Sequence, residues 1–338
     1  MKRTLIIAEA GVNHNGDINI AKKLVDAAAD AGVDYVKFQT FKADKLVNKD
    51  AKQADYQIEN TGVVESQYQM LKRLELTDEN HHILIDYCDK KGVKFLSTAF
   101  DFESIEFLKD KLDFYKIPSG EITNLPYLIK VAKLKLPIVM STGMANMQEV
   151  KEALAVLIAH GINKEDVTIL HCNTEYPTPM KDVNLLAMKT IEKELGVEIG
   201  YSDHTLGIEI PISAVTLGAT VIEKHFTDTK GLKGNDHFHS IDKKDLIKFR
   251  KNIDLLNKID GVSKKREVLK SEKKSRINAR RSIVARNNIS KGEKFTFNNL
   301  IMKRPGFGIS PTKIFKVIGK TARKNISEDS IINFKDII

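Results

Sequence analysis

The length, composition and charge of the chain exclude several classes of protein. Its 338 residues are 42% hydrophobic and 29% charged, which is typical of a soluble globular protein with one large domain and a small one. No apolar run approaches the roughly 18 residues that a membrane span needs. The two cysteines lie far apart without a CxxC pattern, which favours free thiols in a reducing compartment. We therefore expect a cytoplasmic protein.

The net charge of +9 is concentrated in the last part of the chain. Residues 280–338 hold 13 Lys and Arg against 4 Asp and Glu, so the preceding residues are close to neutral in sum. Such a basic segment suits a nucleic-acid or membrane surface, and it equally suits a lid over an anionic substrate. Composition does not choose between these functions.

Eight short apolar runs alternate with longer amphipathic stretches. Two of the stretches, 15–32 and 146–161, show the spacing of apolar residues that is typical of helices. Strands alternating with helices predict parallel βαβ units, and eight units over about 250 residues predict a (β/α)8 TIM barrel. A doubly wound open sheet is the alternative, although no GxGxxG follows the first run. The eight predicted strands are 5–11, 35–40, 94–100, 114–120, 137–143, 167–172, 198–204 and 221–226.

Changes in amino-acid composition divide the chain into three parts. Residues 1–260 hold the predicted barrel, and 261–279 are polar and basic with little apolar periodicity, so we interpret them as a linker. In 280–338, Gly and Pro interrupt runs of four to six residues, which predicts a small β-rich module with single-turn helices.

Polar or ionisable residues crowd the C-terminal ends of all eight predicted strands. In a TIM barrel these ends and the loops after them build the active site. A polar residue at one strand end more often simply faces water, but eight in succession favour a functional ring. In chain order the residues are Glu9; Lys37 and Gln39; Ser97 and Thr98; Lys116, Ser119 and Glu121; Ser141 and Thr142; His171 and Asn173; Ser202 and His204; Glu223 and His225.

The cations and hydroxyls of this ring indicate an anionic substrate. Lys37 and Lys116, with hydroxyls such as those of Ser119, Ser141 and Ser202, suit phosphate and carboxylate oxygens. Buried lysines without an anion tend to lose their protons, so their presence favours either a bound anion or a Schiff base. A Schiff-base aldolase with Lys37 or Lys116 as nucleophile therefore remains an alternative.

Two histidines are candidates for a metal site. His204 and His225 end neighbouring strands, so their imidazoles can converge on one ion and leave open positions for substrate. His14 lies in a loop with no evident partner. His81 and His82 lie on a predicted helix, and we expect both to be solvated.

Seven motifs together resemble the N-acetylneuraminate (sialic acid) synthase family: AEAGVNHNGD, VKFQTFKADKL, KIPSGEITNLPYL, STGMA, HCNTEYPTP, GYSDHT and EKHFT. KRPGFGIS is similar to the family's small C-terminal antifreeze-like (SAF) module. The resemblance implies an enzyme that condenses phosphoenolpyruvate with N-acetylmannosamine and water to give N-acetylneuraminate and phosphate. It also implies a divalent metal, with Mn²⁺ expected and Mg²⁺ or Co²⁺ as alternatives.

The resemblance assigns roles to individual residues. His204 and His225 match the two metal ligands. The positions that match the phosphoenolpyruvate site are Lys37, Lys116, Ser119, Ser141 and Ser202. Those around the sugar and the attacking water are Glu9, Gln39, Glu121, Tyr176 and Asp236, of which we assign Glu9, Gln39 and Glu121 to catalysis. To the substrate-binding set we add Thr98, Asn173 and Thr174 from the ends of the third and sixth strands.

Arg304, in KRPG, matches an arginine that reaches the N-acyl group of the sugar from the C-terminal module of a partner subunit. The resemblance thus implies a domain-swapped homodimer in which the basic module covers a neighbour's anionic site. We expect no membrane and no nucleic-acid partner, because residues 280–338 lack a recognition motif and interleaved aromatics. An ice-binding role would rest on likeness of fold alone.

The chain departs from the family pattern at two places. The loop that often reads SGPDH in relatives is KGNDH at 233–237, and STPFD is replaced by STAFD, with Ala99 in place of proline. Synthases of N-acetylneuraminate and of N,N′-diacetyllegionaminate share most of these motifs. The second type uses 2,4-diacetamido-2,4,6-trideoxymannose, and the motifs leave the choice of sugar open.

Overall fold

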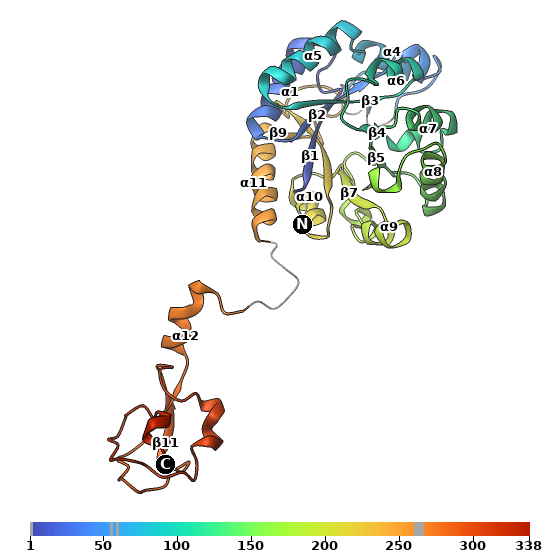
Figure 1. Ribbon diagram of the computed structural model, residues 1–338. Helices are drawn as coiled ribbons and strands as arrows, with labels where there is room; N and C mark the ends of the chain where they lie inside the picture. Colours follow the sequence, from blue (N-terminus) through green and yellow to red (C-terminus); the bar gives the residue numbers. More distant parts are fainter. Residues whose placement is uncertain (1–2, 55–56, 59–60, 260–266) are drawn as a thin grey trace. The chain divides into compact units, whose positions relative to one another are not determined.

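The computed structural model describes residues 3–54, 57–58, 61–259 and 267–338. The chain divides into two compact units, Met1–Gly261 and Val262–Ile338, which are described separately (Figure 1). The predicted linker, 261–279, falls at the start of the second unit except for its first residue, Gly261, which ends the first unit. Its residues up to 266 lie outside the described part of the chain.

The first unit is built around eight parallel strands in the order β3-β2-β1-β8-β7-β6-β5-β4. The end strands β3 and β4 lie next to each other, without a ladder between them in the described residues, so the barrel is almost closed. The predicted TIM barrel is confirmed and the open-sheet alternative is wrong. The strands are β1 (Leu5–Gly11), β2 (Tyr35–Thr40), β3 (Lys94–Ala99), β4 (Tyr115–Ile117), β5 (Ile138–Ser141), β6 (Val167–Cys172), β7 (Glu198–Asp203) and β8 (Val221–Thr227), with the short β9 (Ile241–Asp242) paired to β8.

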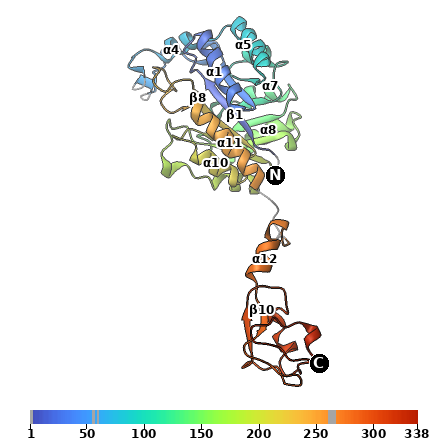
Figure 2. The ribbon, with the colours of Figure 1, turned by 90° about the vertical axis from the view of Figure 1, so that its left-hand side faces the viewer.

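Helices cover the outside of the barrel (Figure 1). In the view turned by 90°, α1, α10 and α11 lie over β1 and β8 (Figure 2). The helices are α1 (Ile18–Ala31), α2 (Ala43–Leu46), α4 (Gln67–Leu74), α5 (Asp78–Lys91), α6 (Phe102–Leu108), α7 (Leu125–Ala132), α8 (Met147–Ala159), α9 (Ala187–Leu195), α10 (Glu209–Thr216) and α11 (Lys243–Ile259), with 3-10 turns at Ser119–Glu121, Lys164–Asp166 and Met180–Asp182.

Local sequence signals fix the ends of these helices. The Asp17 carboxylate accepts a hydrogen bond from the Asn19 backbone N–H at 2.7 Å and starts α1. Gly32 ends the same helix at φ 68°, in the left-handed region that glycine adopts without steric cost. Asn146 and Glu149 form a reciprocal capping box at the start of α8. The chain therefore turns sharply between strand and helix, as short βα loops require.

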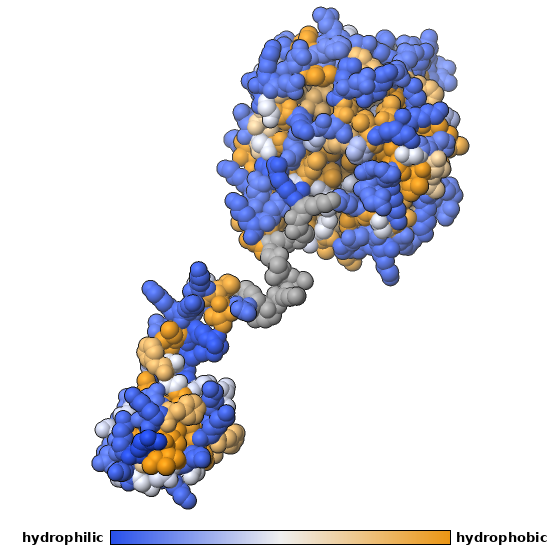
Figure 3. Space-filling view, in the orientation of Figure 1, coloured by the Kyte–Doolittle hydropathy of each residue, from blue (hydrophilic) through white to orange (hydrophobic). Residues whose placement is uncertain are grey.

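A continuous apolar core fills the space between the strands and the helices. On the face seen in Figure 3, hydrophilic residues cover much of the first unit, and apolar side chains show between them. In the described part of the chain, no helix is both long enough and apolar enough to cross a membrane. Both cysteines, Cys88 and Cys172, are buried free thiols.

Two histidines differ from their predicted environments. His81 is fully buried between the Thr40 hydroxyl (2.8 Å) and the Thr77 carbonyl (2.9 Å), so the prediction of a solvated side chain is wrong. The physical reason is helical spacing, since His81 shares the inward stripe of α5 with the buried Leu84 and Cys88. His14 is also buried, and its Nδ1 accepts a hydrogen bond from the Gly16 N–H at 2.9 Å.

The second unit has a small core of its own. Strands β10 (Ser282–Ala285) and β11 (Leu300–Lys303) pair antiparallel, and Ile283, Phe295 and Val317 are completely buried. Its helical segments are α12 (Lys273–Ala279) and the 3-10 turns Lys270–Glu272, Pro311–Lys316 and Phe334–Asp336. Part of the predicted linker is therefore helical.

Candidate active site

Lys37 is the centre of one buried cluster at the C-terminal end of the barrel. Its Nζ lies 2.6 Å from a carboxylate oxygen of Glu9 and donates a hydrogen bond to the Thr98 hydroxyl at 2.9 Å. The three residues come from β1, β2 and β3, which are adjacent in the barrel. All three are almost completely buried. The prediction that strand ends bring these side chains together is correct here.

Lys116 enters the same region from β4. Its Nζ donates a hydrogen bond to the Ser141 hydroxyl at 2.7 Å. Glu223 lies between the two lysines, with one oxygen 3.6 Å from Lys116 Nζ and the other 3.7 Å from Lys37 Nζ. The Ser202 hydroxyl donates to Glu223 at 3.2 Å. The two cations are therefore bridged by one buried carboxylate with hydroxyls around it.

Gly11 connects this cluster to the histidines. A bulge interrupts the pairing of β1 with β2 between Glu9 and Gly11, and Gly11 has φ +52°. A Cβ at Gly11 would lie 3.3 Å from both Glu9 Oε1 and His225 Cε1, and 3.5 Å from Gln39 Nε2. Gln39 also donates to Glu9 at 3.3 Å. The missing side chain of Gly11 thus leaves room where Glu9, Gln39 and His225 meet.

The two predicted metal ligands lie side by side at the ends of β7 and β8. The ring centroids of His204 and His225 are 5.4 Å apart. His204 Nδ1 is 2.5 Å from the Asn173 backbone oxygen, so this nitrogen carries the proton and Nε2 keeps its lone pair. Tyr176 packs on His204 with a centroid separation of 4.2 Å.

Two residues of the loop after β8 complete the histidine side. Asp236 lies with one carboxylate oxygen 3.9 Å from His225 Nδ1. His239, a residue that sequence reasoning missed, lies 5.0 Å from His225 and 5.1 Å from Tyr176 between ring centroids. It is 1% exposed. The substituted loop at 233–237 therefore still delivers Asp236 to the site.

Burial and charge set the protonation of the lysine cluster. Burial raises the pKa of Glu9 to about 7, although Lys37 opposes this effect. For Glu223 burial acts in the same direction, but Lys116 and Lys37 outweigh it and lower the pKa. Burial lowers the pKa of Lys116, whereas that of Lys37 is raised because Glu223 and Glu9 outweigh its burial. Lys37 and Glu223 are thus charged, and Glu9 is poised to exchange a proton near neutral pH.

On the histidine side, burial favours neutral groups. It lowers the pKa of His204 to about 4 and that of His239 to about 3, and it lowers the pKa of His225 well below the ordinary range. It raises the pKa of Asp236 to about 7. Neutral imidazoles keep a lone pair, which metal coordination and hydrogen-bond acceptance both need.

The remaining predicted residues are spread more widely. Ser119 accepts from the Gly143 N–H at 2.8 Å, and a Cβ at Gly143 would lie 2.5 Å from Thr174 Cγ2, so Ser119 and Thr174 flank one glycine. Glu121 is half-buried and accepts a hydrogen bond from the Asn124 side chain at 2.6 Å, outside the lysine cluster. Arg304 is exposed in the second unit, and its role stays a prediction.

Comparison with known proteins assigns this chain to a family. The NeuB family matches residues 24–265, and the SAF domain matches residues 280–338. The chain belongs to the NeuB family. It is 50% identical to the N,N′-diacetyllegionaminic acid synthase of Campylobacter jejuni over 98% of this chain and 99% of that protein, and 45% identical to the N,N′-diacetyllegionaminic acid synthase of Legionella pneumophila over 98% and 94%. A solved N-acetylneuraminic acid (sialic acid) synthetase from Leptospira borgpetersenii is 32% identical, with a TM-score of 0.69 over 81% of this chain and 90% of that one.

The predicted resemblance is therefore confirmed for both units. This NeuB-family protein is a carbon–carbon bond-forming transferase of the N-acetylneuraminate synthase type, with the SAF domain at its C-terminus. The sequence motifs had predicted this class of enzyme.

Sequence reasoning missed His239 of this NeuB-family site and gave Glu223 no role of its own. Glu223 belongs to the predicted ring of strand-end residues, and it is the carboxylate that both lysines approach. Its period-two spacing from His225 predicts that both side chains share one face of the strand. His239 lies in an irregular loop, where no periodicity indicates which way a side chain points.

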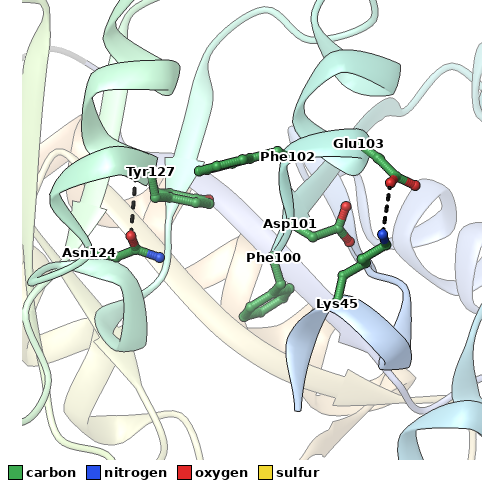
Figure 4. Close-up of a pocket in the computed structure, with 7 residues that line it drawn as sticks. All are labelled: Lys45, Phe100, Asp101, Phe102, Glu103, Asn124 and Tyr127. Carbon is green, nitrogen blue, oxygen red and sulfur yellow. Dashed lines mark hydrogen bonds and ion pairs between the residues drawn. The ribbon is translucent and has the colours of Figure 1, made fainter. Parts of the chain in front are cut away.

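A separate cavity of about 310 Å³ lies beside the ends of β3 and β4 (Figure 4). Phe100, Phe102 and Tyr127 contribute its apolar lining, and Lys45 and Glu103 pair across it at 3.3 Å. Because that pair cancels its own charge, the cavity offers no net cation to an enol phosphate. The two lysines that could bind an anion lie instead in the buried cluster of Lys37 and Lys116.

Proposed function

We propose that the enzyme condenses phosphoenolpyruvate with 2,4-diacetamido-2,4,6-trideoxymannose and water, giving N,N′-diacetyllegionaminate and phosphate. The 50% and 45% identity to two N,N′-diacetyllegionaminic acid synthases over nearly the whole chain carries this choice. N-acetylmannosamine, giving N-acetylneuraminate, is the second candidate sugar. Both sugars are N-acylated and present an open-chain aldehyde, so the chemistry at the reacting carbons is the same.

The lysine cluster supports a site for the enol phosphate. Lys37 and Lys116 supply charge-assisted hydrogen bonds to carboxylate and phosphate oxygens, with hydroxyls from Ser119, Ser141 and Ser202. Fixed on rigid strands, these groups hold the enol beside the aldehyde, and such orientation contributes on the order of 7–11 kcal/mol to catalysis. Lys116, whose pKa is lowered by burial, gains a partner for its proton when the anion binds.

The histidine side fits a divalent ion. His204 offers Nε2 because its Nδ1 donates to a backbone carbonyl, and His225 Nδ1 is buried without a hydrogen-bond partner in the described residues. Two neutral imidazoles would hold the ion and leave positions open for substrate. When bound, the ion supplies Lewis-acid polarisation of the sugar aldehyde. We propose Mn²⁺, with Mg²⁺ or Co²⁺ as alternatives.

The residues between the two clusters suit proton handling. In the proposed reaction a bond forms between C3 of phosphoenolpyruvate and the aldehyde carbon, water adds to C2, and the C2–O bond to phosphate then breaks. Glu9, with a pKa of about 7, accepts the proton from the attacking water at neutral pH. Gln39, Tyr176 and Asp236 orient the sugar, and Glu121 holds its hydroxyls further out.

The Schiff-base alternative depends on a lysine that can lose its proton. Lys37 is held charged by Glu9 and Glu223, which makes it a poor nucleophile. Lys116 has a lowered pKa and is the stronger candidate. Borohydride trapping of the enzyme with substrate would support this alternative, whereas loss of activity in EDTA and recovery with Mn²⁺ would contradict it.

We further propose a cytoplasmic, domain-swapped homodimer in which Arg304 of each chain reaches the sugar in the partner's site. The surplus of nine positive charges in residues 280–338 supports a role beside an anionic substrate.

The decisive experiment offers phosphoenolpyruvate and Mn²⁺ with each sugar and measures phosphate release. We expect kcat/KM to be at least about tenfold higher with the diacetamido sugar, because hydrogen bonds and apolar contacts to one extra acetamido group are worth on the order of 1.4 kcal/mol. A preference for N-acetylmannosamine would reassign the enzyme to N-acetylneuraminate synthesis. If neither sugar supports phosphate release, both assignments are contradicted.

A further inference from the structure

His239 is a buried polar residue that the reaction described above does not use. Its side chain is 1% exposed, and neither Nδ1 nor Nε2 has a hydrogen-bond partner among the described residues. Buried polar groups in folded proteins nearly always have a partner, so a histidine with two unpaired nitrogens requires an explanation. Other buried histidines in this unit are better satisfied, since His81 has two partners and His237 has the Thr227 hydroxyl at 2.7 Å.

His239 packs against two residues of the candidate active site. Its ring packs 5.0 Å from His225 and 5.1 Å from Tyr176 between centroids. It comes from the same loop as Asp236, whose carboxylate lies beside His225. A ligand that binds beside His225 and Tyr176 would therefore lie close to His239.

Three ligands are available at this end, and the geometry separates them. The enol phosphate needs cations, and these lie at Lys37 and Lys116, beyond Glu9 and Gly11 from His239. A third metal-ligand role is unsupported, because the described residues contain no three His, Cys, Asp or Glu side chains placed to hold one ion. The acceptor sugar remains, and its hydroxyl and amide groups are hydrogen-bond partners that the ring nitrogens of a histidine can bind.

We infer that His239 binds a hydroxyl or amide group of the acceptor sugar and so contributes to sugar selection. The inference rests on the proposed function, because it requires the sugar to lie on the histidine side. One ring nitrogen donates and the other accepts, so His239 can read both polarities of an acylamino or hydroxyl substituent. It is a substrate-binding residue and takes no part in bond making.

The test compares KM values in the full-length enzyme. His239→Ala should raise the KM for the sugar about five- to tenfold, the effect of losing one buried hydrogen bond, with the KM for phosphoenolpyruvate and the affinity for Mn²⁺ unchanged. His239→Asn keeps a polar atom near Nδ1, and His239→Gln keeps one near Nε2. At least one of them should restore most of the sugar KM, which a merely space-filling role would not produce.

His237→Ala serves as the matched control, because it removes a buried histidine from the same loop and leaves His239 in place. An equal rise of the sugar KM in that variant would mean that loop order is responsible and would overturn the inference. An unchanged sugar KM in His239→Ala would also overturn the inference, because it would mean that water satisfies the ring. A loss of Mn²⁺ affinity in His239→Ala would overturn it as well. Failure of the wild-type enzyme to turn over either sugar would instead contradict the proposed function itself.

Discussion

Glu223 is the buried carboxylate that lies between the two lysines of the candidate site, and it influences the charge of both. It lies 3.6 Å and 3.7 Å from two lysines that would otherwise face each other in a low-dielectric interior. Its negative charge favours the protonated form of both lysines and opposes the lowering of the Lys116 pKa by burial. In the proposed reaction an enol phosphate brings further negative charge to the same lysines, so we expect Glu223 and the substrate to compete for them.

Glu223→Gln should therefore destabilise the first unit by about 3 kcal/mol, because it leaves buried cations without their shared partner. Phosphoenolpyruvate should raise the melting temperature of this variant more than that of the wild type, since the anion replaces the lost charge. Thermal unfolding with and without phosphoenolpyruvate measures both effects.

Glu192→Gln, the same change in an exposed pair with Lys189, provides the control and should cost less than about 0.5 kcal/mol. Equal stabilisation of wild type and Glu223→Gln by the ligand would contradict the competition between Glu223 and substrate.

His14 makes stability depend on pH. Burial lowers its pKa to about 4, compared with an ordinary value of 6.5, so the unfolded chain binds the proton more tightly. Its contribution is present above pH 6.5 and is lost as the pH falls toward 4. Between pH 7 and pH 5 we expect a loss on the order of 2 kcal/mol in the free energy of unfolding.

Urea unfolding at several pH values tests this dependence. His14→Asn keeps an acceptor for the Gly16 N–H and should flatten the slope below pH 6.5, while the same substitution at the exposed His82 controls for the loss of a histidine as such. An undiminished slope in His14→Asn would show that other groups are responsible.

The predictability of individual residues follows from the regularity of their surroundings. Lys37, Glu9 and His225 lie in strands whose ends must meet, so the chain order of the strands was enough to bring them together. The prediction for His81 is wrong because the inward stripe that it shares with Leu84 and Cys88 outweighs its polarity. His239 and Asn124 lie in loops, and only tertiary packing decides where such side chains point.

At the scale of elements, strands β7 and β8 position the two proposed metal ligands. A buried ion pair also joins these two strands. Asp203 and Lys224 face each other in the ladder and form an ion pair of 2.7 Å with both side chains at most 1% exposed. Lys224 also donates to the Thr205 carbonyl, and the Thr205 hydroxyl donates to Asp203. His204 directly follows Asp203, and His225 directly follows Lys224. The Asp203–Lys224 ion pair therefore fixes the positions of the two histidines relative to each other.

Lys224→Met should destabilise the first unit by roughly 3–5 kcal/mol, because it strands a buried carboxylate. It should also weaken Mn²⁺ binding, since the histidines lose their common register. Calorimetric titration of the folded variant at low temperature measures the affinity. The double variant Asp203→Asn with Lys224→Met should recover stability, because no buried charge is left unpaired.

Lys230→Met removes an exposed lysine paired with Asp245 and should change neither property measurably. Unaltered Mn²⁺ affinity in a folded Lys224→Met protein would refute the link between the ion pair and the histidines.

At the level of element bounds, β1, β2 and β6 have the predicted limits, and β8 extends one residue beyond its predicted end. Their β-branched and aromatic residues indicate strands even though single positions are polar. β4 is shorter than predicted, since Pro118 ends it and Ser119–Glu121 form a 3-10 turn. Helix α12 was missed within the predicted linker because its residues are polar and exposed, so no apolar period revealed it.

At the scale of the whole molecule, the chain combines two units with separate cores. The first core runs through the barrel and its helices, and the second consists of a small set of residues such as Ile283, Phe295 and Val317. The basic charge belongs to the second unit, whereas the lysine cluster and the histidines belong to the first. Stability and catalysis can therefore be separated by experiment.

Deleting residues 280–338 should leave the first unit folded, with a urea midpoint close to that of the full-length protein, because its core loses no buried residue. Synthesis should nevertheless fall at least about tenfold, since the charged hydrogen bond that we propose for Arg304 is worth roughly 1.5–3 kcal/mol. Arg304→Ala in the full chain should reproduce much of this loss, whereas Arg286→Ala, at an exposed position of the same unit, should not. Full-rate synthesis by the truncated protein would disprove the covering role of the basic unit while leaving the chemistry of the barrel unaffected.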